Sequence, residues 1–266
     1  MNSRNILIYF SVIYQGDYEK IYDAITKREA PTEEAVNETL KTVTSPCLTI
    51  LDEDYPEYLK QKTVFPPFVL YYYGDISLIN DETKNIAFIG SRECSDYGAF
   101  VTNKLVSQVS EKFNIVSGLA RGIDSCAHRA CINKIGKTIA VLGSGIDYCY
   151  PPKNIQLYKI IKKKGLIISE YPGKTPPLNI NFPRRNRIIV ALSRAVVITE
   201  AKLHSGTQIS TNYALLSGKD VCCVPYPIDH DSLCNALIKE GAFLIESVQD
   251  LYAAIGYQED EPLFAL

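Results

Sequence analysis

Residues 115–124 read Ile-Val-Ser-Gly-Leu-Ala-Arg-Gly-Ile-Asp, and this stretch decides the fold. Ile115 and Val116 are β-branched and predict a buried strand, and the two glycines predict a turn. We expect the residues that follow, about 124–134, to form a helix. A short apolar strand that passes through a glycine turn into a helix is the repeating unit of a parallel sheet covered by helices.

The same unit recurs on both sides of this stretch. The expected strands are 47–51, 68–73, 86–89, 115–116, 138–142, 166–168, 195–199, 220–224 and 243–245, and from the third onward they are separated by helices near 98–112, 124–134, 154–163, 184–193, 206–217 and 232–240. Near-continuous apolar strands that alternate with helices favour a sheet covered on both faces. The sequence therefore predicts an α/β fold with a doubly wound, mostly parallel sheet, an extended Rossmann-like fold. Its ligand should lie beyond the carboxyl ends of the strands.

The first part of the chain has a different pattern. Tyr18, Ile21 and Ile25 recur at helical spacing, and no β run precedes residue 47. We therefore expect residues 1–45 to form a short N-terminal helical segment and residues 46–266 to form the extended Rossmann-like domain.

Composition and charge indicate a globular chain with an uneven charge distribution. The 266 residues are 46% hydrophobic, and 28 Lys and Arg nearly balance 30 Asp and Glu, for a net charge of −2. Residues 151–190 nevertheless carry nine basic residues and one acid, whereas residues 220–266 carry nine acids and one base. The chain as a whole is not a polycation, but its basic middle can form an anion-binding face.

The cysteines and the apolar runs indicate where the protein works. None of the eight cysteines forms a Cys-x-x-Cys pair, and the three histidines do not stand at metal-ligand spacing from them. We therefore expect no metal site, and a reducing, cytoplasmic location suits so many free thiols. No apolar run has the length of a membrane span, so we expect no membrane association.

Four expected strand ends carry glycine and small polar residues. Three of them supply the candidate phosphate ligands Gly90, Ser91, Arg92, Gly118, Arg121, Gly122, Ser205, Gly206 and Thr207; the fourth reads Gly143-Ser144-Gly145. Glycine lets backbone N–H groups approach an anion, and helix N-termini favour negative charge. Neither a complete Gly-x-Gly-x-x-Gly fingerprint nor a Gly-x-x-x-x-Gly-Lys-Ser/Thr loop is present, so we expect no dinucleotide or other cofactor.

The most unusual local feature is at residues 181–189, which read Asn-Phe-Pro-Arg-Arg-Asn-Arg-Ile-Ile. Arginines in the first turns of a helix are unfavourable, and a bound anion would offset that cost. Phe182 beside Arg185, Asn186 and Arg187 offers a ring on which a base can stack. Lys153 and Asn154 open another helix and are candidate contacts to backbone phosphates.

Catalytic candidates are few. Asp124 and His128 are four residues apart on one expected helix, where a capping aspartate and a satisfied core histidine explain them without chemistry. Glu170 and Glu200 follow strands and could serve an N-glycosidase, but no nucleophile or metal partner accompanies them. We therefore assign no catalytic residue and expect a protein that is not an enzyme.

These motifs, taken in order, resemble the DNA-processing protein A family, also called DprA or Smf. The resemblance rests on Gly90-Ser91-Arg92, on residues 117–124 with His128, on Tyr150-Pro151 with Asn154, on Phe182-Pro183 with residues 185–187, and on Ser205-Gly206-Thr207. It covers about residues 46–256. It implies an extended Rossmann domain that binds single-stranded DNA and helps to load the RecA recombinase during natural transformation. The resemblance thus implies a role in competence and in DNA recombination. It also implies that Arg92, Lys153, Phe182 and residues 185–187 contact DNA, and we expect a homodimer.

One function of another class stays open. A nucleotide-binding N-glycosidase, similar to the phosphoribohydrolases that activate cytokinins, would use comparable glycine loops for phosphate. Those enzymes carry a Gly-Gly-x-x-Gly-Thr-x-x-Glu helix start, and the corresponding stretch here, Ser205 to Ser210, has no glutamate. Release of a nucleoside from its monophosphate would separate the enzyme from the DNA-binding protein.

Overall fold

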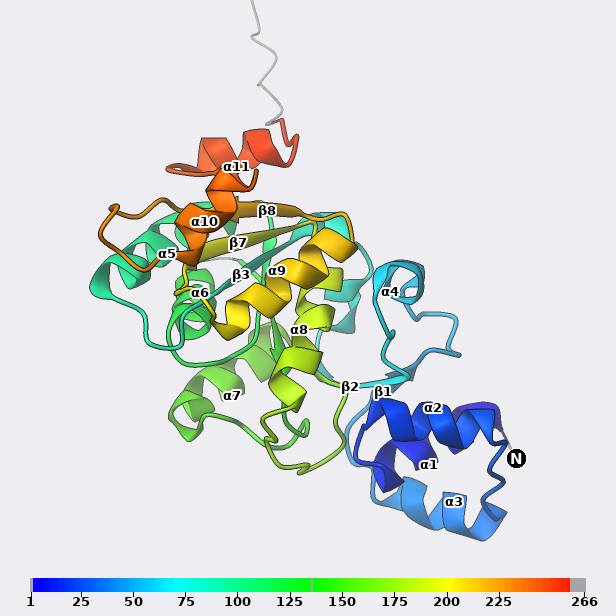
Figure 1. Cartoon of the computed structure of the whole chain (residues 1–266). Coiled ribbons are helices and arrows are strands. Elements are labelled where there is room, and N and C mark those ends of the chain that lie inside the picture. Colours follow the sequence, from blue (N-terminus) through cyan, green and yellow to red (C-terminus); the bar gives the residue numbers. More distant parts are fainter. Residues whose placement is uncertain (1, 135, 259–266) are drawn as a thin grey trace, which may run out of the picture.

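A single nine-stranded sheet organises the molecule, as a computed structural model of the chain shows for residues 2–134 and 136–258 (Figure 1). The strands lie in the order β1-β2-β6-β5-β4-β3-β7-β8-β9. Their bounds are β1 Cys47–Thr49, β2 Val69–Gly74, β3 Asn85–Gly90, β4 Asn114–Ser117, β5 Thr138–Leu142, β6 Leu166–Ser169, β7 Ala195–Glu200, β8 Asp220–Cys223 and β9 Phe243–Leu244. From β6 to β9 all neighbours are parallel, and β2 pairs antiparallel with both β1 and β6.

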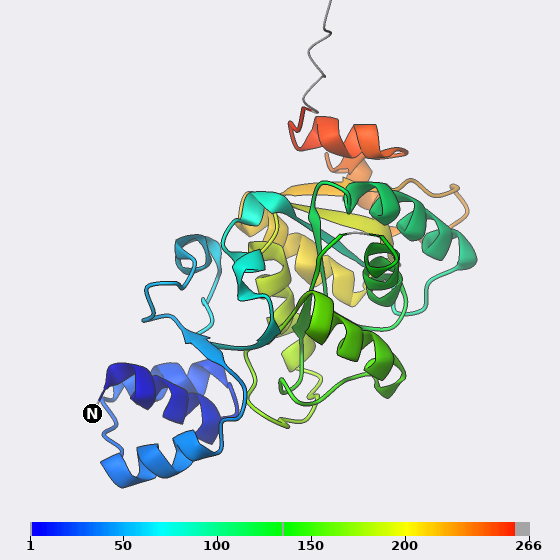
Figure 2. The same cartoon turned by 180° about the vertical axis from the view of Figure 1, so that it is seen from behind.

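Helices cover both faces of this sheet. They are α1 Ser3–Ile13, α2 Tyr18–Thr26, α3 Glu33–Lys41, α4 Glu57–Lys62, α5 Asp96–Val109, α6 Ile123–Ile132, α7 Ile155–Lys164, α8 Asn181–Ala191, α9 Gly206–Leu216, α10 Leu233–Lys239 and α11 Val248–Ala254, with short 3-10 turns at Ile76–Ile79, Glu82–Lys84 and Pro152–Asn154. Figure 1 shows α8 and α9 in front of the sheet, and the reverse view in Figure 2 shows α5, α6 and α7 there. This arrangement confirms the predicted doubly wound, mostly parallel α/β fold.

The side chains of each strand point alternately to the two faces of the sheet, and they form the two main hydrophobic cores, one on each face. In β3, Ile86 and Phe88 pack with the helices α5 and α6, whereas Ala87 and Ile89 pack on the opposite face with α8 and its neighbours. All four side chains are buried. Successive residues of a strand point to opposite faces, so a strand that is apolar at every position has to be covered on both sides.

The three N-terminal helices share a core with one edge of the sheet. Asn2, Asp17 and Thr32 cap the helices α1, α2 and α3 through their side-chain oxygens. Phe10 of α1 belongs to a cluster of buried side chains with Tyr71 of β2, whose hydroxyl lies 3.0 Å from the Ser11 Oγ. The three helices lie between Ser3 and Lys41, and α1 packs directly on β1 and β2.

Helix α8 begins earlier than the sequence pattern suggests. The expected start was near residue 184 with Pro183 at the first turn, and the helix actually begins at Asn181. Pro183 is therefore the third helical residue. Its missing N–H costs no helical hydrogen bond, because the first four N–H groups of a helix have no partner within it.

Among the residues that the structure describes, no helix is both long enough and apolar enough to cross a membrane. The eight cysteines are free thiols. In the same described part of the chain, no three His, Cys, Asp or Glu side chains gather in a way that could hold a metal ion.

Candidate functional site

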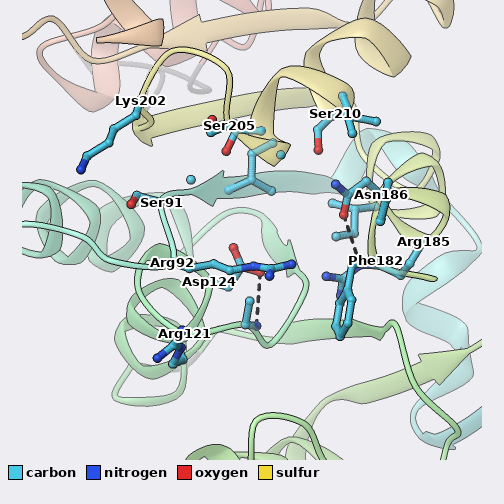
Figure 3. Close-up of a pocket in the computed structure, with 18 of the residues that line it drawn as sticks. Ser91, Arg92, Arg121, Asp124, Phe182, Arg185, Asn186, Lys202, Ser205 and Ser210 are labelled. Atoms are coloured by element: carbon cyan, nitrogen blue, oxygen red, sulfur yellow. Dashed lines mark hydrogen bonds between the residues drawn. The ribbon is translucent and has the colours of Figure 1, made fainter. Parts of the chain in front are cut away.

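A cavity of about 400 Å³ lies at the carboxyl ends of β3, β4 and β7 (Figure 3). From β3 the chain continues to β4, β5 and β6 on one side of β3 within the sheet, and it then returns to β7 on the other side of β3. Such a point of reversal leaves a crevice between the loops, and it is where doubly wound folds bind their ligands. The loop that follows each of the three strands lines the cavity, together with the first turns of α8 and α9.

Arg92 and Phe182 form the centre of the cavity. The Arg92 guanidinium lies over the Phe182 ring, 5.1 Å from its centroid, and the Tyr150 ring lies 5.6 Å from the same ring. A Cβ on Gly143 would lie 2.7 Å from the Phe182 ring, so this glycine makes the room that the ring needs. Arg92 is exposed and forms no hydrogen bond or ion pair with the described residues, which leaves its charge available to a ligand.

Arg185 lies beneath the cavity instead of projecting into it. Its guanidinium is buried and donates to the Gly118 carbonyl at 2.6 Å and to the Val141 carbonyl. A Cβ on Gly118 would lie 2.3 Å from the Arg185 Nη2, so Gly118 is needed for this packing. Burial lowers the pKa of Arg185 to about 10. Arg185 therefore ties the loop after β4 to the end of β5.

Asp124 holds the same loop from its other side. Its carboxylate accepts from the Gly118 and Ala120 N–H groups at 3.2 and 3.3 Å. Burial raises the pKa of Asp124, and the Arg185 charge opposes that rise. Asp124 thus has the structural role that its position at a helix start suggests.

His128 is buried on the inner face of α6. Thr138 donates its hydroxyl to the Ile115 carbonyl, so it accepts from the His128 Nδ1 at 2.7 Å. The His128 Nε2 is buried without a partner among the described residues. Protonation there would place an unbonded charge in the core, and burial lowers the pKa of His128 to about 3. Asp124 and His128 therefore both support the loop after β4 from within, and of the two only Asp124 also lines the cavity.

Gly122 allows the loops after β3 and β4 to meet. It has a φ of +70°, and a Cβ there would lie 2.1 Å from the Ser91 carbonyl oxygen. The next residue, Ile123, donates its N–H to that oxygen at 3.0 Å. A side chain at position 122 would push away the loop that carries Arg92.

The N-terminus of α9 supplies the third wall of the cavity. Ser205 occupies the N-cap position without a side-chain cap bond, and its Oγ is buried without a partner among the described residues. A Cβ on Gly206 would meet open space. Free N–H groups at a helix start attract anions, and the exposed Lys202 lines the same wall. This end of α9 can therefore receive a phosphate.

The structure gathers ten of the residues singled out in the sequence around this cavity. They are Gly90, Ser91, Arg92, Arg121, Phe182, Arg185, Asn186, Ser205, Gly206 and Thr207. Gly118 and Gly122 shape the loop behind it. Lys202 was missed by the sequence reasoning, although its place two residues after the strand-end Glu200 was a usable signal.

The arginines at the start of α8 have partners within the protein, so no bound anion is needed to offset the charges of Arg184 and Arg187. Arg187 is buried, and its Nη2 lies 2.6 Å from the Oε1 of Glu170. Arg184 pairs with Glu19 at 3.1 Å. Arg187 lines a second cavity beside α2, so the structure does not bring it to Arg92 and Phe182.

Lys153 and Asn154 also lie outside the main cavity. Asn154 is buried and donates to the Leu119 carbonyl at 2.8 Å, so it supports the loop after β4 from below. Lys153 is exposed beside it, and its contact with DNA stays a prediction.

Comparison with known proteins agrees with this geometry. The sequence profile of the family described as DNA recombination-mediator protein A matches residues 46–256. The chain is 42% identical to the DNA processing protein DprA of Streptococcus pneumoniae over 211 residues, which are 78% of this chain and 73% of that protein. It is 44% identical to the Protein Smf of Synechocystis over 214 residues, 79% of this chain and 54% of that protein.

Two solved structures have the same fold. The X-ray structure of DprA from Streptococcus pneumoniae superposes with a TM-score of 0.76 at 34% identity, covering 94% of this chain and 92% of that one. DNA processing protein A from Helicobacter pylori, whose structure was reported for its single-stranded DNA binding mode, superposes with a TM-score of 0.73 at 29% identity, covering 82% and 99%. The protein described here therefore belongs to the DNA recombination-mediator protein A family.

Proposed function

We propose that the cavity at the carboxyl ends of β3, β4 and β7 binds single-stranded DNA. The observation that carries this proposal is the pairing of Arg92 with Phe182, an unpaired guanidinium 5.1 Å from the centre of an aromatic ring. The guanidinium suits a phosphate, and the ring suits an unstacked base. Phosphate binding is further supported by the open N-terminus of α9 with Ser205, Gly206 and Lys202.

The shape of the site favours a single strand over a duplex. A cavity of about 400 Å³ has the size of a small-molecule pocket, which can take in a base and its phosphate but not a double helix. Paired bases are stacked on each other and cannot lie on Phe182 without being separated first. The Helicobacter pylori relative, whose single-stranded DNA binding mode was studied structurally, points the same way.

We further propose that the protein acts as a recombination mediator that helps to load RecA during natural transformation. The family description, which names a recombination mediator, supports the mediator part of this role. We propose that the protein is a homodimer in the cytoplasm. A sedimentation experiment that finds only monomer at all concentrations would contradict the proposed dimer. The exposed Phe243 and Leu244 on the edge strand β9 suit a contact between copies.

Binding without catalysis is the better account of the carboxylates. Glu200 accepts from the Ser95 N–H and hydroxyl and from the Tyr226 hydroxyl. Glu170 is paired with Arg187. Asp124 lines the cavity, but its Oδ2 already accepts from two backbone N–H groups, which does not suit a general acid or base. Release of a nucleoside from a nucleoside monophosphate by the purified protein would overturn the non-enzymatic proposal.

The central test compares single-stranded with duplex oligonucleotides by fluorescence anisotropy over a range of salt concentrations. The parent protein should bind the single strand more tightly. Arg92→Gln should lower the affinity and reduce the slope of log K against log salt by about 0.7, because one phosphate contact is lost. Lys104→Gln removes the same charge from the exposed side of α5 and is the control. Equal affinity for both forms of DNA, or an unchanged slope in Arg92→Gln, would refute the proposal.

A further inference from the structure

The part of the chain that contains α6 and α7 is rich in basic residues. Residues 121–169 contain nine Lys and Arg and only two acids. All nine basic side chains are exposed, and none of them forms an ion pair with another residue that the structure describes. Of the two acids, Asp124 is buried, and the Asp147 carboxylate accepts the Tyr73 hydroxyl at 2.7 Å. This part of the chain therefore carries unneutralised positive charge.

This basic part of the chain begins at the loop that lines the cavity. Arg121 and Ala120 line the cavity itself. Asn154 donates to the Ala120 carbonyl at 3.3 Å and accepts from the Arg129 Nη2 at 3.4 Å. Arg129 and Lys153, the residue before Asn154, thus flank the outside of the same loop.

From there the charge continues to the opposite end of the sheet. Helix α6 has ten residues, so it spans about 15 Å. Beyond its end, the Lys137 Nζ donates to the Lys164 carbonyl at 3.2 Å, which brings these two lysines together where α7 ends. Figure 2 shows α6 and α7 next to each other on this side of the molecule. We call the line formed by Arg129, Lys153, Lys137 and Lys164 the basic strip.

We propose that the basic strip binds the phosphate backbone of the DNA strand whose base occupies the cavity, and so guides the strand along α6 and α7. This inference rests on the proposed function of the cavity. A cavity of about 400 Å³ cannot enclose a long strand, which has to continue across the surface. The four members of the basic strip are Lys and Arg side chains, which bind phosphates without reading bases.

The test is the length dependence of binding to oligothymidines. We compare strands of about 4 and about 16 nucleotides, the two ends of common single-strand site sizes. For the parent protein the longer strand should bind more tightly and with a steeper salt dependence. The triple variant Arg129→Gln, Lys137→Gln, Lys164→Gln should bind the short strand like the parent and lose about 2 from the salt slope of the long strand, at about 0.7 for each contact.

A second triple variant controls for net charge. Lys84→Gln, Lys104→Gln, Lys112→Gln removes three exposed positive charges outside the basic strip, and it should bind both strands like the parent. Thermal melting verifies that both triple variants fold. The inference is overturned if both triple variants weaken long-strand binding equally, if the strip variant leaves the long strand unaffected, or if it weakens short and long strands alike. Failure of the parent to bind the short strand would instead contradict the proposed function of the cavity.

Discussion

Replacing Arg187 by Met should destabilise the protein and leave its DNA site intact. The Arg187 guanidinium forms two bonds with Glu170, at 2.6 and 2.9 Å, and also donates to the Phe65 and Arg184 carbonyls, both at 2.9 Å. The side chains of Arg187 and Glu170 are only 5% and 6% exposed. The pair thus joins α8 to the end of β6 and to the loop before β2.

The magnitude follows from the burial of the pair. Removing one partner of a buried ion pair leaves an uncompensated charge and costs about 3–5 kcal/mol. The whole free energy of unfolding of a protein is about 5–15 kcal/mol, so this loss is large. At roughly 2–4 °C per kcal/mol for a chain of this size, the melting temperature should fall by roughly 6–20 °C.

Urea unfolding and DNA anisotropy, measured on the same variants, test this reasoning. Arg187→Lys keeps the charge but not the two-pronged geometry, and it should lie between Arg187→Met and the parent in stability. Removing both charges, in Glu170→Gln with Arg187→Met, should recover part of the loss. Arg92→Met is the reciprocal control, with parental stability and weakened DNA binding. If Arg187→Met unfolds within about 1 kcal/mol of the parent and loses DNA binding, the pair is not structural and the reasoning is refuted.

Three further predictions concern the loops and the core behind the cavity. Phe182→Leu should weaken single-strand binding by about 1–3 kcal/mol, measured by anisotropy. Phe100→Leu, which changes an exposed aromatic on α5, should leave binding unchanged. Equal effects of the two variants would exclude stacking on Phe182. Gly122→Ala should lower the free energy of unfolding in urea by at least about 1 kcal/mol and weaken DNA binding, because φ is +70° and the Ser91 carbonyl blocks a Cβ. Gly206→Ala is its control, because a Cβ there would meet open space. Equal stability of the two variants would contradict this account. Burial lowers the folded pKa of His128 to about 3. Below about pH 6.5 the unfolded chain therefore binds a proton that the folded protein does not, and the free energy of unfolding decreases as the pH is lowered. Relative to His128→Asn, the parent should lose about 2 kcal/mol more between about pH 7 and pH 5, and parallel pH profiles would show that His128 does not titrate in this way.

Much of the fold could be predicted from local sequence. The strands β3 to β8 are runs of buried β-branched and apolar residues, and each is followed by a turn and a helix. The strand expected at 243–245 is Phe243–Leu244 in the structure, and α8 begins at Asn181 and not near residue 184, because the ends of elements depend on neighbours that are distant in sequence. The loops that surround the cavity were also predictable, since parallel strands place all their carboxyl ends along one edge.

The role of each glycine was decided by its neighbours in space. In the sequence Gly118 and Gly122 look like equivalent ligands of a phosphate. In the structure a Cβ on Gly118 would meet the Arg185 guanidinium, and a Cβ on Gly122 would meet the Ser91 carbonyl. Gly206 alone of these three opens onto free space. A glycine in a loop reports that room is needed, and only the packing shows what needs it.

The arginines show most clearly where sequence reasoning ends. The sequence determined the order of strands and helices, the glycine turns and the cluster of basic residues at the start of α8, because these are properties of neighbouring residues. It could not determine which arginines stay free. Successive residues of a helix point about 100° apart, so adjacent side chains enter different surroundings. Arg184 meets the acids of α2, Arg185 the carbonyls under the cavity, and Arg187 the buried Glu170, while Arg92 on its loop keeps an unpaired charge. The tertiary structure makes this selection, because a buried cation requires acceptors that only distant parts of the chain can supply.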